Sequence, residues 1–188
     1  MCTTWSSVAF WKTPASSTRR LKAPTIRAAS DCLQRRGELA GVFQNATLDH
    51  VVHTAESLQL TMVQLHGDEG PSYAAEVARR TGAKVVKASR VRSRADVVAL
   101  QPYRTDFHLL DGAGGEPFDW RLVRSHRSPV PLIVAGGLTA GNVEDAIAAT
   151  EPYAVDVARG IEADGRPGVK DPEKVAAFAA AAQGAHVA

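Results

Sequence analysis

The sequence lacks the features that stabilise chains too small to form a core. It has two cysteines in 188 residues, Cys2 and Cys32, and neither stands in a CxxC or Cys/His spacing. Their scarcity argues against a disulfide framework and against structural zinc, and it favours a reducing compartment. The sequence also has no run of about 18 consecutive apolar residues, so it predicts no membrane span.

The chain has little net charge, +2 at pH 7, which gives no indication of nucleic-acid binding. The charge is unevenly distributed, because residues 1–37 hold seven basic side chains against one acid, Asp31. An acid-poor stretch rich in arginine and serine is typical of a transit peptide. Later residues of the same stretch nevertheless resemble enzyme sequence, so we expect a cytoplasmic protein, with an organelle as the alternative if this basic stretch is a transit segment.

Internal repeats, linkers and low-complexity tracts are absent apart from an alanine-rich final segment, so we expect residues 1–188 to form a single domain. Short apolar runs alternate with longer amphipathic stretches, and each run has the length of a fully buried strand. The predicted strands are Val8–Phe10, Leu39–Phe43, Thr61–Leu65, Lys84–Lys87, Phe107–Leu110, Pro131–Ala135 and Ala154–Val157. The predicted helices are Leu48–Leu58, Ser72–Arg80, Ser93–Leu100, Trp120–Ser125, Gly141–Ala148 and Pro172–Ala182, the last capped by Asp171.

This alternation predicts an α/β protein with parallel strands joined by crossover helices. Two architectures remain, an open doubly wound sheet and a TIM-type (β/α)8 barrel. No GxGxxG follows the first strand, which weakens the case for a dinucleotide-binding sheet. Glycine or polar residues follow nearly every strand, as in a barrel whose loops form one face. We predict a barrel, incomplete at about seven strands because the chain is shorter than the ~200 residues a barrel usually needs.

Two glycine turns follow the last two predicted strands. Gly136 and Gly137 lie in the first, in Ala135–Leu138, and Gly160 lies in the second, within Val155–Glu162. Glycines let backbone amides approach a ligand closely, and barrels commonly bind phosphate at this position. The sequence predicts a phosphate site, and the alternative is a pair of tight loops that bind nothing.

Asp111 ends the apolar run Phe107–Leu110, where a carboxyl at the mouth of a barrel is partly desolvated. Desolvation raises a carboxyl pKa, which suits a general acid; the alternative is an aspartate that caps loop amides.

Asp119 is interpreted as a helix cap. His66, just after another strand, could contact substrate, transfer a proton or bond a loop, and Asp68 and Glu69 are interpreted as charges complementing the dipole of the next helix.

Taken together, these motifs resemble one family, the phosphoribosylanthranilate isomerases of tryptophan biosynthesis. The resemblance is carried by Gln64–Glu69, Leu109–Asp111, Gly114–Gly115, Phe118–Trp120, Ala135–Leu138, Asn142–Val143, Pro152–Val157, Gly160–Glu162 and Pro167–Asp171. It implies conversion of N-(5-phosphoribosyl)anthranilate to 1-(2-carboxyphenylamino)-1-deoxyribulose 5-phosphate by an Amadori rearrangement, without metal or organic cofactor. The implied partner is this small phosphorylated substrate, with no nucleic acid and no membrane.

The resemblance also implies roles for individual residues. Asp111 matches the family's general acid, and Gly136, Gly137 and Gly160 match its phosphate loops, to which Arg159 would add charge. Arg19 matches the arginine near the anthranilate group. The residues that match the lining of the same pocket are Gln64, His66 and Asp156.

The chain departs from the family over residues 1–38, the divergent part. The family's general base is a cysteine in a Lys-x-Cys-Gly strand, but Cys2 has no glycine after it and stands too close to Val8–Phe10 for a crossover of at least ~10–12 residues. Cys32 falls in the expected second helix, where a buried structural thiol is the ordinary interpretation. The first β/α unit is therefore missing from the pattern. Three hypotheses stay open: an isomerase, monomeric or dimeric through an open barrel edge; an inactive relative that binds phosphate ligands or acts as a scaffold; and an incomplete gene product whose first strand is supplied upstream or by another chain.

Overall fold

The computed structural model describes Trp11–Lys12 and residues 39–185. These residues form two compact units, which we describe separately. The N-terminal unit comprises residues 39–88 and 102–107 together with Trp11–Lys12, and the C-terminal unit comprises residues 89–101 and 108–185. The boundary between them falls within one strand and at the first residue of the next.

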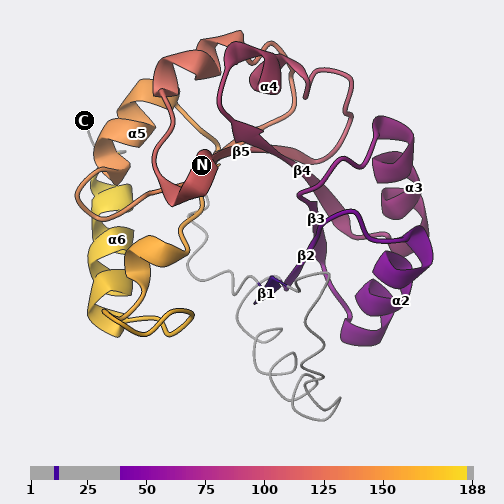
Figure 1. Ribbon diagram of the computed structural model, residues 1–188, viewed down its shortest axis with the longest axis horizontal. Helices are drawn as coiled ribbons and strands as arrows, with labels where there is room; N and C mark the ends of the chain where they lie inside the picture. The colour runs from indigo at the N-terminus through magenta and orange to yellow at the C-terminus, as the bar shows by residue number, and fades with distance from the viewer. Residues whose placement is uncertain (1–10, 13–38, 186–188) are drawn as a thin grey trace. The chain divides into compact units, whose positions relative to one another are not determined.

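The N-terminal unit is a parallel sheet whose strands are joined by helices. Its strands are β1 (Trp11–Lys12), β2 (Ala40–Phe43), β3 (Met62–Leu65) and the first part of β4 (Lys84–Val91). Each strand pairs in parallel with the next along the chain, so that Leu65 lies opposite Lys87. The crossover helices α2 (Leu48–Leu58) and α3 (Pro71–Thr81) lie side by side against one face of these strands (Figure 1).

Local chemistry sets the ends of these two helices. Thr47 caps α2 by accepting a hydrogen bond from the His50 amide, and Pro71 occupies the first turn of α3, where a missing N–H costs nothing. Gly82 then ends α3 in the left-handed conformation. The apolar faces of the helices close a core with the strands. That core includes Leu39, Phe43, Val51, Ala55, Val63, Leu65, Ala74, Val77 and Val85.

The C-terminal unit repeats the strand–helix alternation with shorter elements. Its parallel strands are β5 (Phe107–Gly112), β6 (Leu132–Val134) and β7 (Ala154–Val155), and its α-helices are α4 (Arg94–Val98), α5 (Val143–Thr150) and α6 (Pro172–Gly184). Three 3-10 helices complete it, η1 (Ala113–Gly115), η2 (Trp120–Ser125) and η3 (Arg159–Ile161). Helices α5 and α6 pack side by side through Val143, Ala146, Ile147, Phe178 and Ala182 (Figure 1).

A histidine pair lies inside the C-terminal unit. His108 on β5 is fully buried, and its Nδ1 lies 2.8 Å from Nε2 of the half-buried His126, with the rings edge to face. Burial lowers the pKa of His126, because desolvation disfavours the imidazolium. In this contact one ring nitrogen donates and the other accepts, which two imidazoles of complementary tautomer allow.

The predicted elements are largely confirmed. Leu48–Leu58 is a helix with the predicted bounds, and Asp171 caps α6 by accepting from the amides of Glu173 and Lys174. The other described elements differ from their predicted bounds by at most two residues at either end, and two elements differ more. Trp120–Ser125 is a 3-10 helix, capped by Asp119 as interpreted, and β4 continues four residues past Lys87, since Ala88 and Val91 are also buried. The predicted strand Val8–Phe10 lies outside the described residues.

Two properties of the described residues bear on function. None of their helices is both long enough and apolar enough to cross a bilayer. Nor do they contain a group of three or more His, Cys, Asp or Glu side chains arranged to hold a metal ion.

Candidate active site

Asp111 lies at the carboxyl end of β5, directly against the glycine turn that follows β6. A Cβ built on Gly136 would lie 2.8 Å from Asp111 Oδ1 and would overlap the amide nitrogen of Gly112. Gly112 is equally constrained, because a side chain there would overlap the carbonyl oxygen of Glu116. The close packing of these two turns therefore depends on glycine, and it leaves the Asp111 carboxyl partly exposed beside the backbone of Gly136.

The turn after β6 has a shape that few other residues could adopt. Gly136 and Gly137 have φ of 86° and 63°, a region that glycine enters without steric cost. The Asn142 side chain braces the turn from the start of α5: its Oδ1 accepts from the Thr139 amide at 2.8 Å, and its Nδ2 donates to the Gly137 carbonyl at 3.0 Å. The turn is therefore held in place by the protein itself.

The second glycine turn packs against the first. A Cβ on Gly160 would overlap the carbonyl oxygen of Leu138, so η3 sits directly on the loop that follows β6. The guanidinium of Arg159 reaches the loop after Asp111, where Nη1 donates to the Gly114 carbonyl at 3.1 Å. The loops after β5, β6 and β7 therefore meet at one place in the C-terminal unit, and the Arg159 side chain joins the loop after β7 to the loop after β5.

Asp156 follows β7 and interacts electrostatically with Asp111. Burial, and after it the nearby Asp111 carboxylate, raise the pKa of Asp156 to about 7, even though Lys170 and the Val157 amide act in the opposite direction. A carboxyl with a raised pKa therefore lies at Asp156, within electrostatic reach of Asp111.

In the N-terminal unit, Gln64 and His66 come from the end of β3. Gln64 is 4% exposed, and its Nε2 lies 3.2 Å from His66 Nδ1. The direction of this hydrogen bond depends on the tautomer of the His66 ring. Gln64 Oε1 is buried and accepts no hydrogen bond from any of the described residues. A buried acceptor of this kind usually has a partner, and a bound ligand can supply one.

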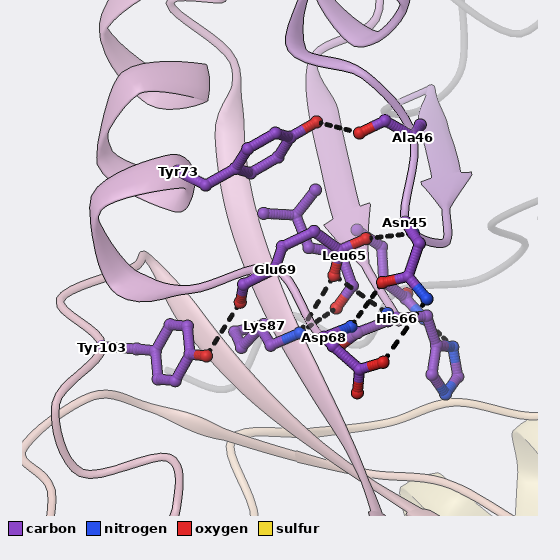
Figure 2. A network of polar contacts seen from close by, with 11 residues as sticks. Asn45, Ala46, Leu65, His66, Asp68, Glu69, Tyr73, Lys87 and Tyr103 are labelled. Atoms are coloured by element: carbon purple, nitrogen blue, oxygen red, sulfur yellow. Dashed lines mark hydrogen bonds and ion pairs between the residues drawn. The ribbon is translucent and has the colours of Figure 1, made fainter.

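The interpretation of Glu69 as a charge complementing the helix dipole misses its main contacts. Helix α3 begins after Gly70 without a side-chain cap, and the Glu69 carboxylate lies 3.1 Å from Lys87 Nζ with both side chains almost fully buried (Figure 2). Sequence reasoning also missed Lys87, although a lysine inside a strand that is buried on both faces signals a buried partner. Three residues discussed from sequence, Arg19, Cys2 and Cys32, lie outside the described residues.

Comparison with known proteins agrees with the motifs. The model of one family, described as N-(5'phosphoribosyl)anthranilate (PRA) isomerase, matches residues 8–181. The N-(5'-phosphoribosyl)anthranilate isomerase of Myxococcus xanthus (strain DK1622) is 44% identical over 178 residues, which cover 89% of this chain and 81% of that protein. The predicted resemblance is confirmed.

Solved structures agree as well. Monomers generated from the dimeric phosphoribosylanthranilate isomerase of Thermotoga maritima superpose with a TM-score of 0.76 at 32% identity, covering 91% of this chain and 84% of that one. A phosphoribosyl anthranilate isomerase in complex with reduced 1-(o-carboxyphenylamino)-1-deoxyribulose 5-phosphate gives 0.74 at 30% identity, covering 94% and 85%. These matches confirm the predicted fold class, a TIM-type barrel in incomplete form, with seven strands among the described residues.

Proposed function

Because this chain belongs to the N-(5'-phosphoribosyl)anthranilate isomerase family, we propose that it carries out that isomerisation in tryptophan biosynthesis, with Asp111 as the general acid. The substrate is N-(5-phosphoribosyl)anthranilate, and the product is 1-(2-carboxyphenylamino)-1-deoxyribulose 5-phosphate. The observation that carries the assignment of Asp111 is its position against the Gly136 turn, which keeps an acid beside a loop suited to phosphate.

The first step needs a proton on the furanose ring oxygen, so that the bond from this oxygen to C1′ breaks and a Schiff base forms at C1′. A base then removes the proton from C2′, and the resulting enolamine becomes the keto product. Asp111 supplies the first proton in this proposal.

Asp156 has a supporting part in the proton transfer. With its pKa near 7 it is about half protonated at neutral pH, so the Asp111–Asp156 pair carries less than its full charge of −2. A proton held on Asp156 limits the repulsion that a second carboxylate would exert on Asp111. It also places a proton source next to the acid after each turnover.

The phosphate group of the substrate occupies the glycine turns in this proposal. Gly136 and Gly137 take positive φ values in the first turn, Gly160 packs the second turn against it, and barrels commonly bind phosphate at such turns after the last two strands. Arg159 would add a positive charge there by exchanging its Gly114 carbonyl for a phosphate oxygen. Glycine amides and one guanidinium are well suited to a dianion.

The remainder of the substrate is assigned to other residues. The buried acceptor Oε1 of Gln64 would receive a hydrogen bond from a ribose hydroxyl or from the anthranilate amine, and His66 would contact the same part of the substrate. Arg19 would pair with the anthranilate carboxylate, as the family motif implies. A cytoplasmic location, with the substrate as the sole required partner, belongs to the same proposal.

Turnover of N-(5-phosphoribosyl)anthranilate by the purified chain tests the proposal, alongside Asp111→Asn and the exposed control Asp145→Asn. We expect Asp111→Asn to lower kcat by about 10²–10⁴, and Asp145→Asn to leave it unchanged. Complementation of a tryptophan auxotroph gives the same comparison in cells. Binding of a reduced product analogue without turnover, unaffected by Asp111→Asn, would instead identify an inactive binding protein.

A further inference from the structure

A buried ion pair lies under the loop that carries His66. The side chains of Lys87 on β4 and Glu69 are 5% and 3% exposed, with Nζ 3.1 Å from Oε2. Placing two charges in a protein interior costs several kcal/mol for each ion unless the pair and its hydrogen bonds offset the desolvation. The hydrogen bonds that the pair makes to the backbone therefore indicate which segment of the chain it stabilises.

Lys87 contacts the backbone on both sides of His66. Besides Glu69, its ammonium donates to the carbonyl oxygens of Leu65, at 3.5 Å, and Gly67 (Figure 2). An ammonium has three protons, and these three acceptors use all of them. Lys87 thus ties the backbone on both sides of His66 to the Glu69 carboxylate.

Glu69 holds the same turn from its other end. Its Oε2 accepts from the Gly67 amide at 2.9 Å, and its Oε1 accepts from the Asn45 amide at 2.6 Å. Burial opposes ionisation of Glu69, but the hydrogen bonds from Asn45 and Lys87 outweigh it and lower the pKa below its usual value. Tyr103 completes the network, since its hydroxyl donates to the Glu69 carbonyl at 2.8 Å and its ring lies 5.6 Å from Lys87 Nζ.

These contacts converge on the short segment from Leu65 to Glu69. The carbonyl before His66, and both the amide and the carbonyl of the residue after it, are bound by the buried pair. The His66 amide itself donates to the Phe43 carbonyl at 2.8 Å. The backbone of His66 is therefore fixed on both sides by charge-assisted bonds, which are stronger than neutral ones.

We propose that Lys87 and Glu69 are positioning residues that orient His66 toward the substrate. This inference rests on the proposed function, in which His66 contacts the substrate. A displacement of about 1 Å at a binding group can cost about 10²-fold in rate. Loss of the tether should therefore reduce kcat/KM through His66 even though neither Lys87 nor Glu69 touches the substrate.

A double-mutant cycle tests the coupling between Lys87 and His66. We expect Lys87→Met to lower kcat/KM by about 10- to 100-fold when His66 is present. In a His66→Ala background the same change should lower it less than about threefold, because the oriented group is gone. Equal losses in the two backgrounds would overturn the proposal and leave the pair a purely structural role. Lys84→Met, on the exposed side of the same strand, is the matched control and should leave kcat/KM unchanged.

A second variant addresses the possibility that Lys87→Met fails to fold. Lys87→Met combined with Glu69→Gln removes both charges, so that no unpaired ion remains buried. We expect this double variant to remain folded and still to lose kcat/KM by at least about tenfold. A folded double variant with wild-type kcat/KM would overturn the proposal.

An NMR measurement separates this inference from the proposed function. The imidazole ¹⁵N and ¹H resonances of His66 report its tautomer and surroundings without any substrate. We expect the Lys87→Met/Glu69→Gln variant to shift these resonances and to leave those of the exposed His53 in place. Unchanged His66 resonances would overturn the inference, whereas absence of turnover by the wild-type chain would overturn only the proposed function.

Discussion

Glu69 of the N-terminal unit and Asp156 of the C-terminal unit are both acids withdrawn from water, but their neighbours carry opposite charges. Lys87 and backbone amides surround Glu69 and lower its pKa, whereas burial and the Asp111 carboxylate raise the pKa of Asp156 to about 7. The first arrangement holds a loop in place, and the second keeps a proton available near neutral pH. Burial alone therefore does not determine the direction of an acid's pKa shift, because the charge of its neighbours also contributes.

The loops of the two units are also built differently. The loop after β3 is held by charge, through the bonds that Lys87 and Glu69 make to backbone groups. The loops after β5, β6 and β7 are held by contact between backbones, which the glycines at 112, 136 and 160 permit. The N-terminal unit should therefore be sensitive to loss of a charge, and the C-terminal unit to the gain of a methyl group.

The largest expected effect is that of Lys87→Met on the N-terminal unit. It leaves the Glu69 carboxylate buried without its cation, and we expect the free energy of unfolding to fall by about 3–5 kcal/mol. Denaturant unfolding measures the loss, and adding Glu69→Gln should restore much of it. A loss no greater than that of the control Lys84→Met would show that the loop does not depend on this charge.

Gly136→Ala tests the glycine packing of the C-terminal unit. The new Cβ would overlap the amide of Gly112 at a φ of 86°, so we expect a loss of about 2–4 kcal/mol in the free energy of unfolding. Gly165→Ala is the matched control, because Gly165 has a φ of 68° but open space around its Cβ position. The control should lose about 1–2 kcal/mol; equal losses for the two variants would contradict the role of close packing.

The two carboxylates should give opposite pH dependences of stability. Folding holds the proton of Asp156 more tightly than the unfolded chain does, so this group removes stability as pH rises from about 4 to 7. The free energy of unfolding of Asp156→Asn should therefore rise relative to that of the wild type across this window, by up to about 4 kcal/mol. Glu69 has a lowered pKa and contributes stability above its unfolded value of 4.5, which is lost on acidification. The free energy of unfolding of Glu69→Gln should accordingly lie below that of the wild type near neutral pH and approach it at low pH. If the free energies of unfolding of the two variants, each taken relative to the wild type, change with pH in parallel, the predicted difference is refuted.

The smallest effects are expected at the helix caps, which the two units form in the same way. Thr47 caps α2 in the N-terminal unit and Asp171 caps α6 in the C-terminal unit, each through a side-chain oxygen. Replacing either by alanine should cost about 1 kcal/mol in the free energy of unfolding. Thermal unfolding of both variants checks this. A much larger loss for one of them would mean that the units also differ in ordinary helix capping.

Much of the fold could be predicted from the sequence, because local patterns determine it. The spacing of apolar residues located α2, and the Asp171–Pro172 pair located the start of α6. The pattern failed at Trp120–Ser125, where apolar spacing does not distinguish an α-helix from a 3-10 helix. It also ended β4 too early, because the exposed Arg90 interrupts the apolar run while the strand continues to Val91.

The candidate site was predictable only in part. Motifs singled out Asp111, Asp156 and the glycine turns, but the raised pKa of Asp156 depends on two acids that are 45 positions apart in the chain. The partnership of Glu69 with Lys87 is likewise tertiary, across a separation of 18 positions. Sequence reasoning assigned Glu69 to the adjacent helix, since the sequence alone does not show which cation a carboxylate will meet.

The histidine pair of the C-terminal unit has a practical consequence for handling the protein. Because burial lowers the pKa of His126 from 6.5, the unfolded chain binds this proton more readily than the folded one, and acidification favours unfolding. Two rings whose nitrogens lie 2.8 Å apart also repel each other if both become cations. An elution or crystallisation buffer of low pH therefore destabilises the packing around His108, whereas storage above pH 7 preserves this packing.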